Sequence, residues 1–431
     1  MTFLKKSIST FATSVGLMVV GMASGIIAAR VLGPELKGQA ALLTTITEFL
    51  FMGGSLGLGS AFSFHIAKQH YPSRHILSCA LFSSVLLGGL AIGVFYLTMP
   101  LHRKVWTGIP QELIFFAALL AVLSIYANYL TRIVVGYGRI NAMNAGGIAS
   151  SLTNFVSIVL LLLVCNFGLN GMMGSFWLAA LAQLAVLLYV LRDDLPLSRF
   201  WTSSLMRNSI SYGVKSQALL LINFLNYRID ILFLKHFTDA TSVGYYSLAV
   251  GMAELMWMVP NAAVAPLFSG IAASEAIDRS QITLRTVRWS MIFLCILAIG
   301  GFLFGKLFIR FLYGADYLPS FMPFLWLLPG ICLFPIFKLL AIDLSARGKP
   351  GFGTISSAVA LVVNIVANVF LIPRMGASGA ALASSISYVC MSLLCMFFFL
   401  QETKYRIRHI FIIDREELQF IKNAVSRYVS W

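Results

Sequence analysis

Residues Ser211–Gly270 read SYGVKSQALLLINFLNYRIDILFLKHFTDATSVGYYSLAVGMAELMWMVPNAAVAPLFSG, and this stretch decides the fold class. It holds two apolar runs, each long enough to cross a bilayer as an α-helix, joined by the polar segment KHFTDATS. The first run carries Lys215, Arg228 and Asp230, and the second carries Glu254. A charge at the bilayer centre costs about 2.5–3.5 kcal/mol on insertion scales, so charged residues are rare in membrane spans that do not use them. We therefore expect these charges to line a polar path through a membrane protein.

The composition of the whole chain agrees with this reading. Of 431 residues, 59% are hydrophobic and 11% are charged, whereas about a quarter of the residues in a soluble domain are charged. The net charge of +15 does not indicate a nucleic-acid partner, because most lysines and arginines lie in alternate connections and in the tail. This is the positive-inside pattern of a bacterial inner (cytoplasmic) membrane protein, and it predicts that both termini are cytoplasmic.

The apolar runs predict an all-α polytopic membrane protein with twelve transmembrane helices. No connection between them is long enough for a separate catalytic domain. We expect a six-helix bundle in residues 1–200, a second one in residues 201–400, and a basic amphipathic tail in residues 401–431 on the cytoplasmic surface. The expected helices are Thr10–Ala29, Gly38–Phe64, Ile76–Met99, Glu112–Val134, Ala142–Cys165, Gly171–Leu191, Ile210–Leu234, Val243–Gly270, Val287–Phe304, Leu318–Ile342, Phe352–Ile372 and Ala377–Leu400.

Residues of the first half recur in the second half in the same order. With six helices per half the two halves have the same orientation, which predicts two pseudo-repeated bundles around a central cavity. The matching residues are Gly38, Leu42 and Glu48 with Gly244, Leu248 and Glu254; Gly138-Arg139 with Gly348-Lys349; Asn154 with Asn364; and GLNG from Gly168 with GASG from Gly376.

Six motifs in order along both halves carry a family resemblance. They are ARVLGPELKGQAAL from Ala29, LGLGSAFSFHIAK from Leu56, VVGYGRINAMN from Val134, RIDILFL from Arg228, VGYYSLAVGMAEL from Val243, and the long segment that begins SARGKPGFG at Ser345. With these motifs the chain resembles the polysaccharide-unit (O-antigen or exopolysaccharide repeat) flippases of the multidrug/oligosaccharidyl-lipid/polysaccharide exporter superfamily. The resemblance covers nearly the whole chain except the tail.

The resemblance implies a V-shaped pair of six-helix bundles and transport by alternating access. The implied cargo is a polyprenyl-diphosphate-linked oligosaccharide, moved from the cytoplasmic to the outer leaflet. Membrane lipids and other polysaccharide-assembly membrane proteins are the implied partners. No site residue is carried over from the family, so the site hypotheses rest on helix geometry alone.

Four residues of the seventh expected helix are candidates for substrate binding and translocation. On a helical wheel Lys215, Asn223 and Asn226 share a face, while Arg228 lies on the other side with Gln217. Lys215 and Arg228 suit the anionic diphosphate, and the asparagines suit sugar hydroxyls. The alternative is that the two cations extend to opposite membrane interfaces.

Three carboxylates are candidates for ion coupling: Glu48, Asp230 and Glu254. Desolvation raises a carboxyl pKa toward neutrality, which suits coupling to H⁺. Na⁺ is the alternative coupling ion. On a helical wheel Glu254 shares a face with Ser247, Gly251 and Asn261, and Glu48 shares one with Thr44, Thr45 and Ser55. The alternative for these carboxylates is a structural hydrogen bond between helices.

Two other functions remain open on the sequence alone. One is a multidrug or small-cation exporter with the same fold, although Lys215 and Arg228 favour an anionic cargo. The other is a membrane enzyme acting on polyprenyl-linked sugars. The sequence has no Walker loop, nucleophile elbow or HExxH motif, so we expect neither a catalytic residue nor a cofactor other than the coupling ion. His65, His70 and His75 share no helical face, and we expect no metal site.

Overall fold

The computed structural model describes residues 3–195, 202–273, 276–403 and 405–412, and within these ranges every regular element is helical. Eleven of the described helical segments are long and apolar enough to cross a membrane. The first of them, which lies in α1 (Phe3–Ser55), contains two helical runs separated at Gly33. The predicted all-α membrane fold with twelve spans is therefore confirmed.

The break inside α1 has a local cause. Gly33 has φ 70° and ψ 174°, a conformation that glycine adopts readily and that residues with a Cβ avoid. Pro34 follows and cannot donate a backbone hydrogen bond to the preceding turn. The two residues end the first run and begin the second.

The chain divides into two compact units. Unit 1 comprises residues 1–248, 307–320 and 372–377, and unit 2 comprises residues 249–306, 321–371 and 378–431. The predicted bundle boundary at residue 200 stays a prediction. The predicted tail helix lies mostly outside the described residues, which in this region include the short helix α15 (Arg408–Phe411).

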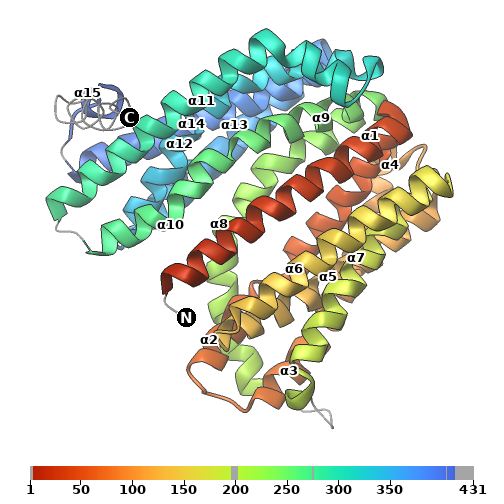
Figure 1. Cartoon of the computed structure of the whole chain (residues 1–431), viewed down its shortest axis with the longest axis vertical. Helices are drawn as coiled ribbons and strands as arrows, with labels where there is room; N and C mark the ends of the chain where they lie inside the picture. Colours follow the sequence, from red (N-terminus) through yellow and green to blue (C-terminus); the bar gives the residue numbers. More distant parts are fainter. Residues whose placement is uncertain (1–2, 196–201, 274–275, 404, 413–431) are drawn as a thin grey trace, which may run out of the picture. The chain divides into compact units, whose positions relative to one another are not determined.

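Unit 1 contains the whole first half of the chain. The helices α6 and α7 run side by side and α5 packs against α7 (Figure 1). The elements after α1 are α2 (Leu58–Ala67), α3 (Ser73–Thr98), η1 (Met99–His102), α4 (Arg103–Trp106), α5 (Gln111–Gly136), α6 (Ile140–Ile158), η2 (Val159–Val164), α7 (Gly168–Val190), η3 (Arg192–Asp194) and α8 (Ser203–Phe237).

The remaining elements complete the second half. Four of them, α9, α11, α13 and α14, contribute residues to both units. They are α9 (Ala240–Met256), α10 (Met258–Ala273), α11 (Ala276–Leu312), η4 (Ala315–Ser320), α12 (Phe321–Ala346), α13 (Gly351–Met375) and α14 (Ala377–Thr403).

Glycines with positive φ show the internal repeat in the backbone. Gly138 and Gly348, which the sequence pairs, have φ 72° and 79° and precede α6 and α13. Gly168 and Gly376, a second predicted pair, have φ 53° and 55° at the starts of α7 and α14. The structure adds a third pair, since Gly108 and Gly314 have φ 84° and 105° before α5 and η4. Corresponding turns of the two halves therefore use the same residue type for the same backbone geometry.

A fourth repeated pair, Gly38 and Gly244, forms a close helix crossing inside unit 1. A Cβ on Gly38 would lie 1.8 Å from the carbonyl oxygen of Ala240, and a Cβ on Gly244 would lie 1.9 Å from that of Pro34. The second run of α1 and the start of α9 thus approach through their backbones, which only glycine permits at this distance.

Two helices that the sequence predicts as continuous are interrupted in the structure, so their predicted continuity is wrong. The expected Gly38–Phe64 helix breaks at Leu56 and Gly57, both with positive φ. The hydroxyl of Tyr129 donates to the carbonyl of Ser55 over 2.8 Å and so satisfies one of the groups that end α1.

The expected Val243–Gly270 helix is interrupted at Trp257, between α9 and α10. The Trp257 ring stacks on Phe334 with a centroid distance of 4.5 Å. Pro260 follows within one turn and cannot donate the hydrogen bond that would continue the helix to Met256. Asn261 thus lies on α10 beyond the break, and its predicted shared face with Glu254 stays a prediction.

A buried carboxylate joins two helices of unit 2. Asp343 on α12 is fully buried and accepts a hydrogen bond from the hydroxyl of Thr283 on α11 over 2.7 Å. Arg347 forms an ion pair with Asp343 and donates to the hydroxyl of Ser280 over 2.8 Å. This network links the two helices near the connection that follows α12.

We expect Asp343→Asn to destabilise the protein by about 2 kcal/mol, because it removes the charge from two hydrogen bonds in a buried site. A lower melting temperature in detergent would show this. Asp316→Asn, at an exposed position of η4, is the control and should melt like the unmodified protein. Equal melting of all three proteins would contradict a stabilising role for the Asp343 network.

Candidate functional site

An ion pair joins α8 to the second run of α1 within segments that are apolar enough to span a membrane. The Nε of Arg228 lies 3.1 Å from Oε2 of Glu48. The side chains of Arg228 and Glu48 are 25% and 46% exposed. Pairing offsets part of the cost of placing either charge in a membrane span, and the remaining exposure leaves both groups accessible.

A second polar contact lies on the same side of α8. The amide Nε2 of Gln217 donates to the carbonyl of Met52 over 3.3 Å and to the hydroxyl of Ser55 over 3.1 Å. The helical wheel predicts that Gln217 and Arg228 share one side of this helix, and their common contact with α1 confirms it. One side of α8 therefore presents polar groups to α1.

On the other side of α8, two polar side chains are buried. Asn226 and Asp230 are fully buried. The hydroxyl of Tyr246 on α9 donates to Oδ2 of Asp230 over 2.5 Å, which joins α8 to α9. Asn223 is half-buried, and its Oδ1 has no hydrogen-bond partner in the described part of the chain. Lys215 lies on α8, but its side chain is outside the described set.

Glu254, the repeat counterpart of Glu48, is half-buried at the end of α9 in unit 2. Its backbone carbonyl accepts the Trp257 N–H over 3.0 Å where the helix ends. The two predicted carboxylates thus belong to different units.

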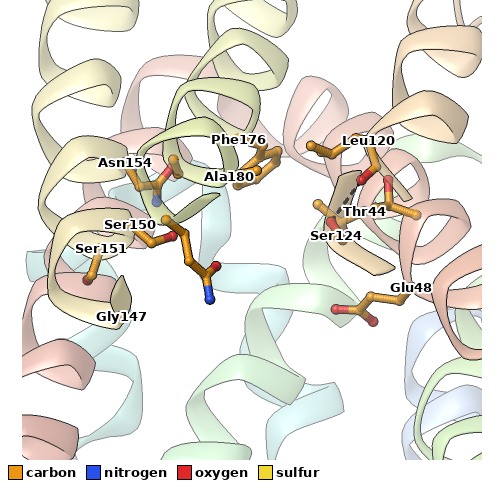
Figure 2. A pocket seen from close by; sticks show the side chains of 13 residues that line it. Thr44, Glu48, Leu120, Ser124, Gly147, Ser150, Ser151, Asn154, Phe176 and Ala180 are labelled. Atoms are coloured by element: carbon orange, nitrogen blue, oxygen red, sulfur yellow. Dashed lines mark hydrogen bonds between the residues drawn. The ribbon is translucent and has the colours of Figure 1, made fainter. Parts of the chain in front are cut away.

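A cavity of about 450 Å³ that is lined by several hydroxyl side chains adjoins Glu48 in unit 1, and we call it the hydroxyl pocket. In Figure 2, Ser150, Ser151 and Asn154 lie across the cavity from Thr44, Ser124 and Glu48. These walls come from α6 on one side and from α1 and α5 on the other. Its lining residues are Thr44, Thr47, Glu48, Leu120, Ser124, Gly147, Ser150, Ser151, Asn154, Phe176, Ala179, Ala180 and Gln183.

The hydroxyl pocket is rich in hydrogen-bond acceptors. Thr44, Thr47 and Ser124 donate their hydroxyl protons to backbone carbonyls, with the Thr47 hydroxyl 2.9 Å from the carbonyl oxygen of Ala117 on α5. Their oxygen lone pairs remain for a ligand. The Oδ1 of Asn154 is buried without a hydrogen-bond partner in the described ranges. A bound group with several O–H or N–H donors would satisfy these acceptors.

The sequence analysis missed this pocket, although a signal for it is present. Gly147, Ser150, Ser151 and Asn154 are spaced by three, four and seven positions, which places small and polar residues on one face of an otherwise apolar helix. Thr44 and Glu48 repeat the pattern on α1 with a spacing of four. Only the tertiary structure shows that the two faces meet.

Comparison with known proteins shows a family match by sequence. The sequence profile of a family described as "polysaccharide biosynthesis protein" matches residues 3–272, more than half of the chain. The succinoglycan biosynthesis transport protein ExoT of Rhizobium meliloti is 25% identical over 262 residues, which cover 57% of this chain. The match spans about half, 48%, of the length of ExoT.

Solved structures share the fold over nearly the whole length. The lipid II flippase MurJ in an inward closed conformation has a TM-score of 0.75 and 16% identity, with 94% of this chain and 89% of MurJ covered. An inward-facing multidrug resistance transporter of the MATE family in the MOP superfamily also has a TM-score of 0.75 and 16% identity, with 90% and 94% covered. The chain has the two-bundle, twelve-helix fold of these transporters.

Proposed function

Because the chain belongs to the polysaccharide biosynthesis protein family, we propose that this multi-pass membrane transport protein is a flippase for a polyprenyl-diphosphate-linked oligosaccharide. It moves the unit from the cytoplasmic to the outer leaflet of a bacterial inner membrane by alternating access. In this proposal residues 1–200 and 201–400 form the two bundles, and both chain termini are cytoplasmic.

The observation that carries the proposal is the hydroxyl pocket next to the Glu48–Arg228 ion pair. The pocket offers oxygen acceptors for sugar hydroxyls, and the neighbouring guanidinium offers a charged donor for a phosphate. An oligosaccharide linked to a diphosphate carries both kinds of group. The volume of about 450 Å³ lies within the range of small-ligand sites, so the pocket suits one or two sugar residues of the cargo.

The candidate residues on α8 receive unequal support. Arg228 is accessible and close to the pocket, and Asn223 has an unsatisfied amide oxygen, so both keep a substrate role in the proposal together with Lys215. Asn226 and Asp230 are fully buried, and Asp230 accepts the Tyr246 hydroxyl. Burial favours the structural alternative for these two side chains.

Glu48 is the carboxylate that best suits coupling to a proton. Protonation would remove the negative charge that pairs with Arg228 and would release the guanidinium for the diphosphate. Glu254 takes the matching role in unit 2 under the same hypothesis. In this scheme the proton binds Glu48, and the released Arg228 then binds the diphosphate of the cargo.

Reconstituted vesicles test the proposed function. A labelled polyprenyl-diphosphate oligosaccharide is incorporated, and the fraction accessible to an external lectin is followed with and without a pH or Na⁺ gradient. We expect the protein to raise the rate of leaflet exchange and a gradient to make it directional. Exchange equal to that of protein-free vesicles would overturn the proposal.

The same vesicles separate the rival functions. A small-cation exporter would transport ethidium and leave the labelled lipid in place, and an enzyme would change the mass of the lipid. The hydroxyl pocket holds one carboxylate, Glu48, which is already paired with Arg228. This arrangement favours a neutral or anionic cargo over a cationic drug.

A further inference from the structure

A second cavity of about 450 Å³ in unit 1 has a different character, and we call it the aromatic cavity. Its walls include Phe49 of α1, Phe95 of α3, Trp106 of α4 and Phe233 of α8. Neither the oligosaccharide site nor the Glu48–Arg228 pair includes any of these residues. The volume falls within the usual range for a small-ligand site.

Trp106, which lines the aromatic cavity, has an unused hydrogen-bond donor. The side chain is only 8% exposed, and its Nε1–H is buried with no hydrogen-bond partner in the described part of the chain. The ring packs edge-on against Phe95 at a centroid distance of 5.5 Å, which fixes its orientation. Buried indole N–H groups usually have a partner, and an unsatisfied donor is costly. An acceptor oxygen from a bound molecule would satisfy it.

The polar groups around the aromatic cavity favour an anion. His102 and His236 line it, and no carboxylate is among the lining residues in the described part of the chain. Arg103, Lys104 and Lys235 are the sequence neighbours of these histidines, and α4 packs against α8. Asp239, three residues after His236 in the sequence, is not a lining residue, and its Oδ1 accepts the Ser242 N–H over 2.7 Å.

The surface beside the aromatic cavity suits contact with acyl chains. Val94, Leu97 and Leu101 on α3 and η1 are 60%, 81% and 78% exposed. In a span this apolar, such side chains face lipid. A molecule that carries both an apolar chain and an anionic oxygen can therefore reach the cavity laterally from the bilayer.

We propose that the aromatic cavity binds an anionic phospholipid. Its chain lies among Phe49, Phe95 and Phe233. A phosphate or ester oxygen accepts the Trp106 Nε1–H, and the cationic groups next to His102 and His236 neutralise the headgroup. The ligand comes from the leaflet at this end of the helices, which the positive-inside pattern assigns to the outer side. The proposal is independent of the transported cargo.

Lipid retention by the purified full-length protein tests the proposal. The protein is exchanged into nanodiscs that contain phosphatidylglycerol, phosphatidylcholine or a polyprenyl phosphate as a minor component, and retained lipid is quantified by native mass spectrometry. We expect phosphatidylglycerol to be retained about tenfold more strongly than phosphatidylcholine. Trp106→Phe keeps an aromatic ring and removes the N–H donor, and it should weaken that retention about fivefold to tenfold.

Matched variants keep the test decisive. Trp326→Phe, at a partly exposed tryptophan outside the cavity, should retain lipid like the unmodified protein. The double variant Lys235→Gln/His236→Gln leaves Trp106 in place and should also lose the preference, which covers the case in which Trp106→Phe does not fold. Unchanged retention in Trp106→Phe, or equal retention of phosphatidylcholine, would overturn the proposal. Stronger retention of polyprenyl phosphate, reduced by the same variants, would overturn the assignment to a phospholipid.

Discussion

Transport is expected to fall about 100-fold when Arg228 is replaced by glutamine. The substitution removes the accessible guanidinium beside the hydroxyl pocket and leaves Glu48 without its ion-pair partner in a membrane span. Losing one member of a buried charge pair costs about 2–5 kcal/mol, and because this pair is partly exposed we take the lower part of that range, about 2.8 kcal/mol, which corresponds to a factor of about 100. Lectin accessibility of the labelled lipid in vesicles measures the rate. Arg374→Gln, at an exposed position near the end of α13, is the matched control and should transport normally.

A charge exchange separates the two roles that Arg228 can play. If its role is to bind the diphosphate, the double variant Glu48→Arg/Arg228→Glu should remain inactive, because the cation has moved to α1 and a carboxylate has taken its place on α8. If the pair is only structural, the exchange should restore transport. Recovery to near the unmodified rate would therefore contradict the substrate role.

The variant Glu48→Gln should fold, and a pH gradient should no longer change its transport rate if this carboxylate couples transport to protons.

Gly244→Val is expected to destabilise the protein by about 3 kcal/mol or to prevent its folding. A Cβ at this position would lie 1.9 Å from the carbonyl oxygen of Pro34, and the obstacle is backbone rather than a flexible side chain. Relief requires the start of α9 to move away from α1, which breaks the packing on both sides of the crossing. The melting temperature in detergent and the yield of monodisperse protein measure the effect.

Gly251→Val is the matched control on the same helix. Nothing lies within 4 Å of a Cβ built at Gly251, so this variant should melt close to the unmodified protein. Similar losses in both variants would indicate that valine in α9 is unfavourable for a general reason, and the crossing would then have no special role. Gly38→Val should resemble Gly244→Val, because its Cβ meets the Ala240 carbonyl from the other side of the same crossing.

Helical periodicity predicted local geometry well where only one helix was involved. The side of α8 shared by Gln217 and Arg228 follows from 100° per residue, and the contacts with Met52, Ser55 and Glu48 confirm it. The same reasoning failed at Trp257, where aromatic stacking with Phe334 on another helix accompanies the break. Local pattern carries no information about such a partner.

The candidate site was only partly visible in the sequence for the same reason. Glu48 and Arg228 are notable as charges in apolar runs, but nothing in either run indicates that they pair with each other. The serines of α6 attract no notice alone, because a hydroxyl in a membrane helix can bond to its own backbone. They become a candidate sugar site when Thr44 and Ser124 face them across a cavity (Figure 2).

The sequence by itself determined the membrane location, the twelve helical runs, the internal repeat and the family, because these depend on hydropathy and on the order of residues along the chain. The tertiary structure decided which charged groups pair, which polar faces enclose a pocket, and why Gly38 and Gly244 must be glycine. The physical reason is that the spacing of residues along the sequence fixes which of them share a helix face. The groups that pack against that face come from distant parts of the chain.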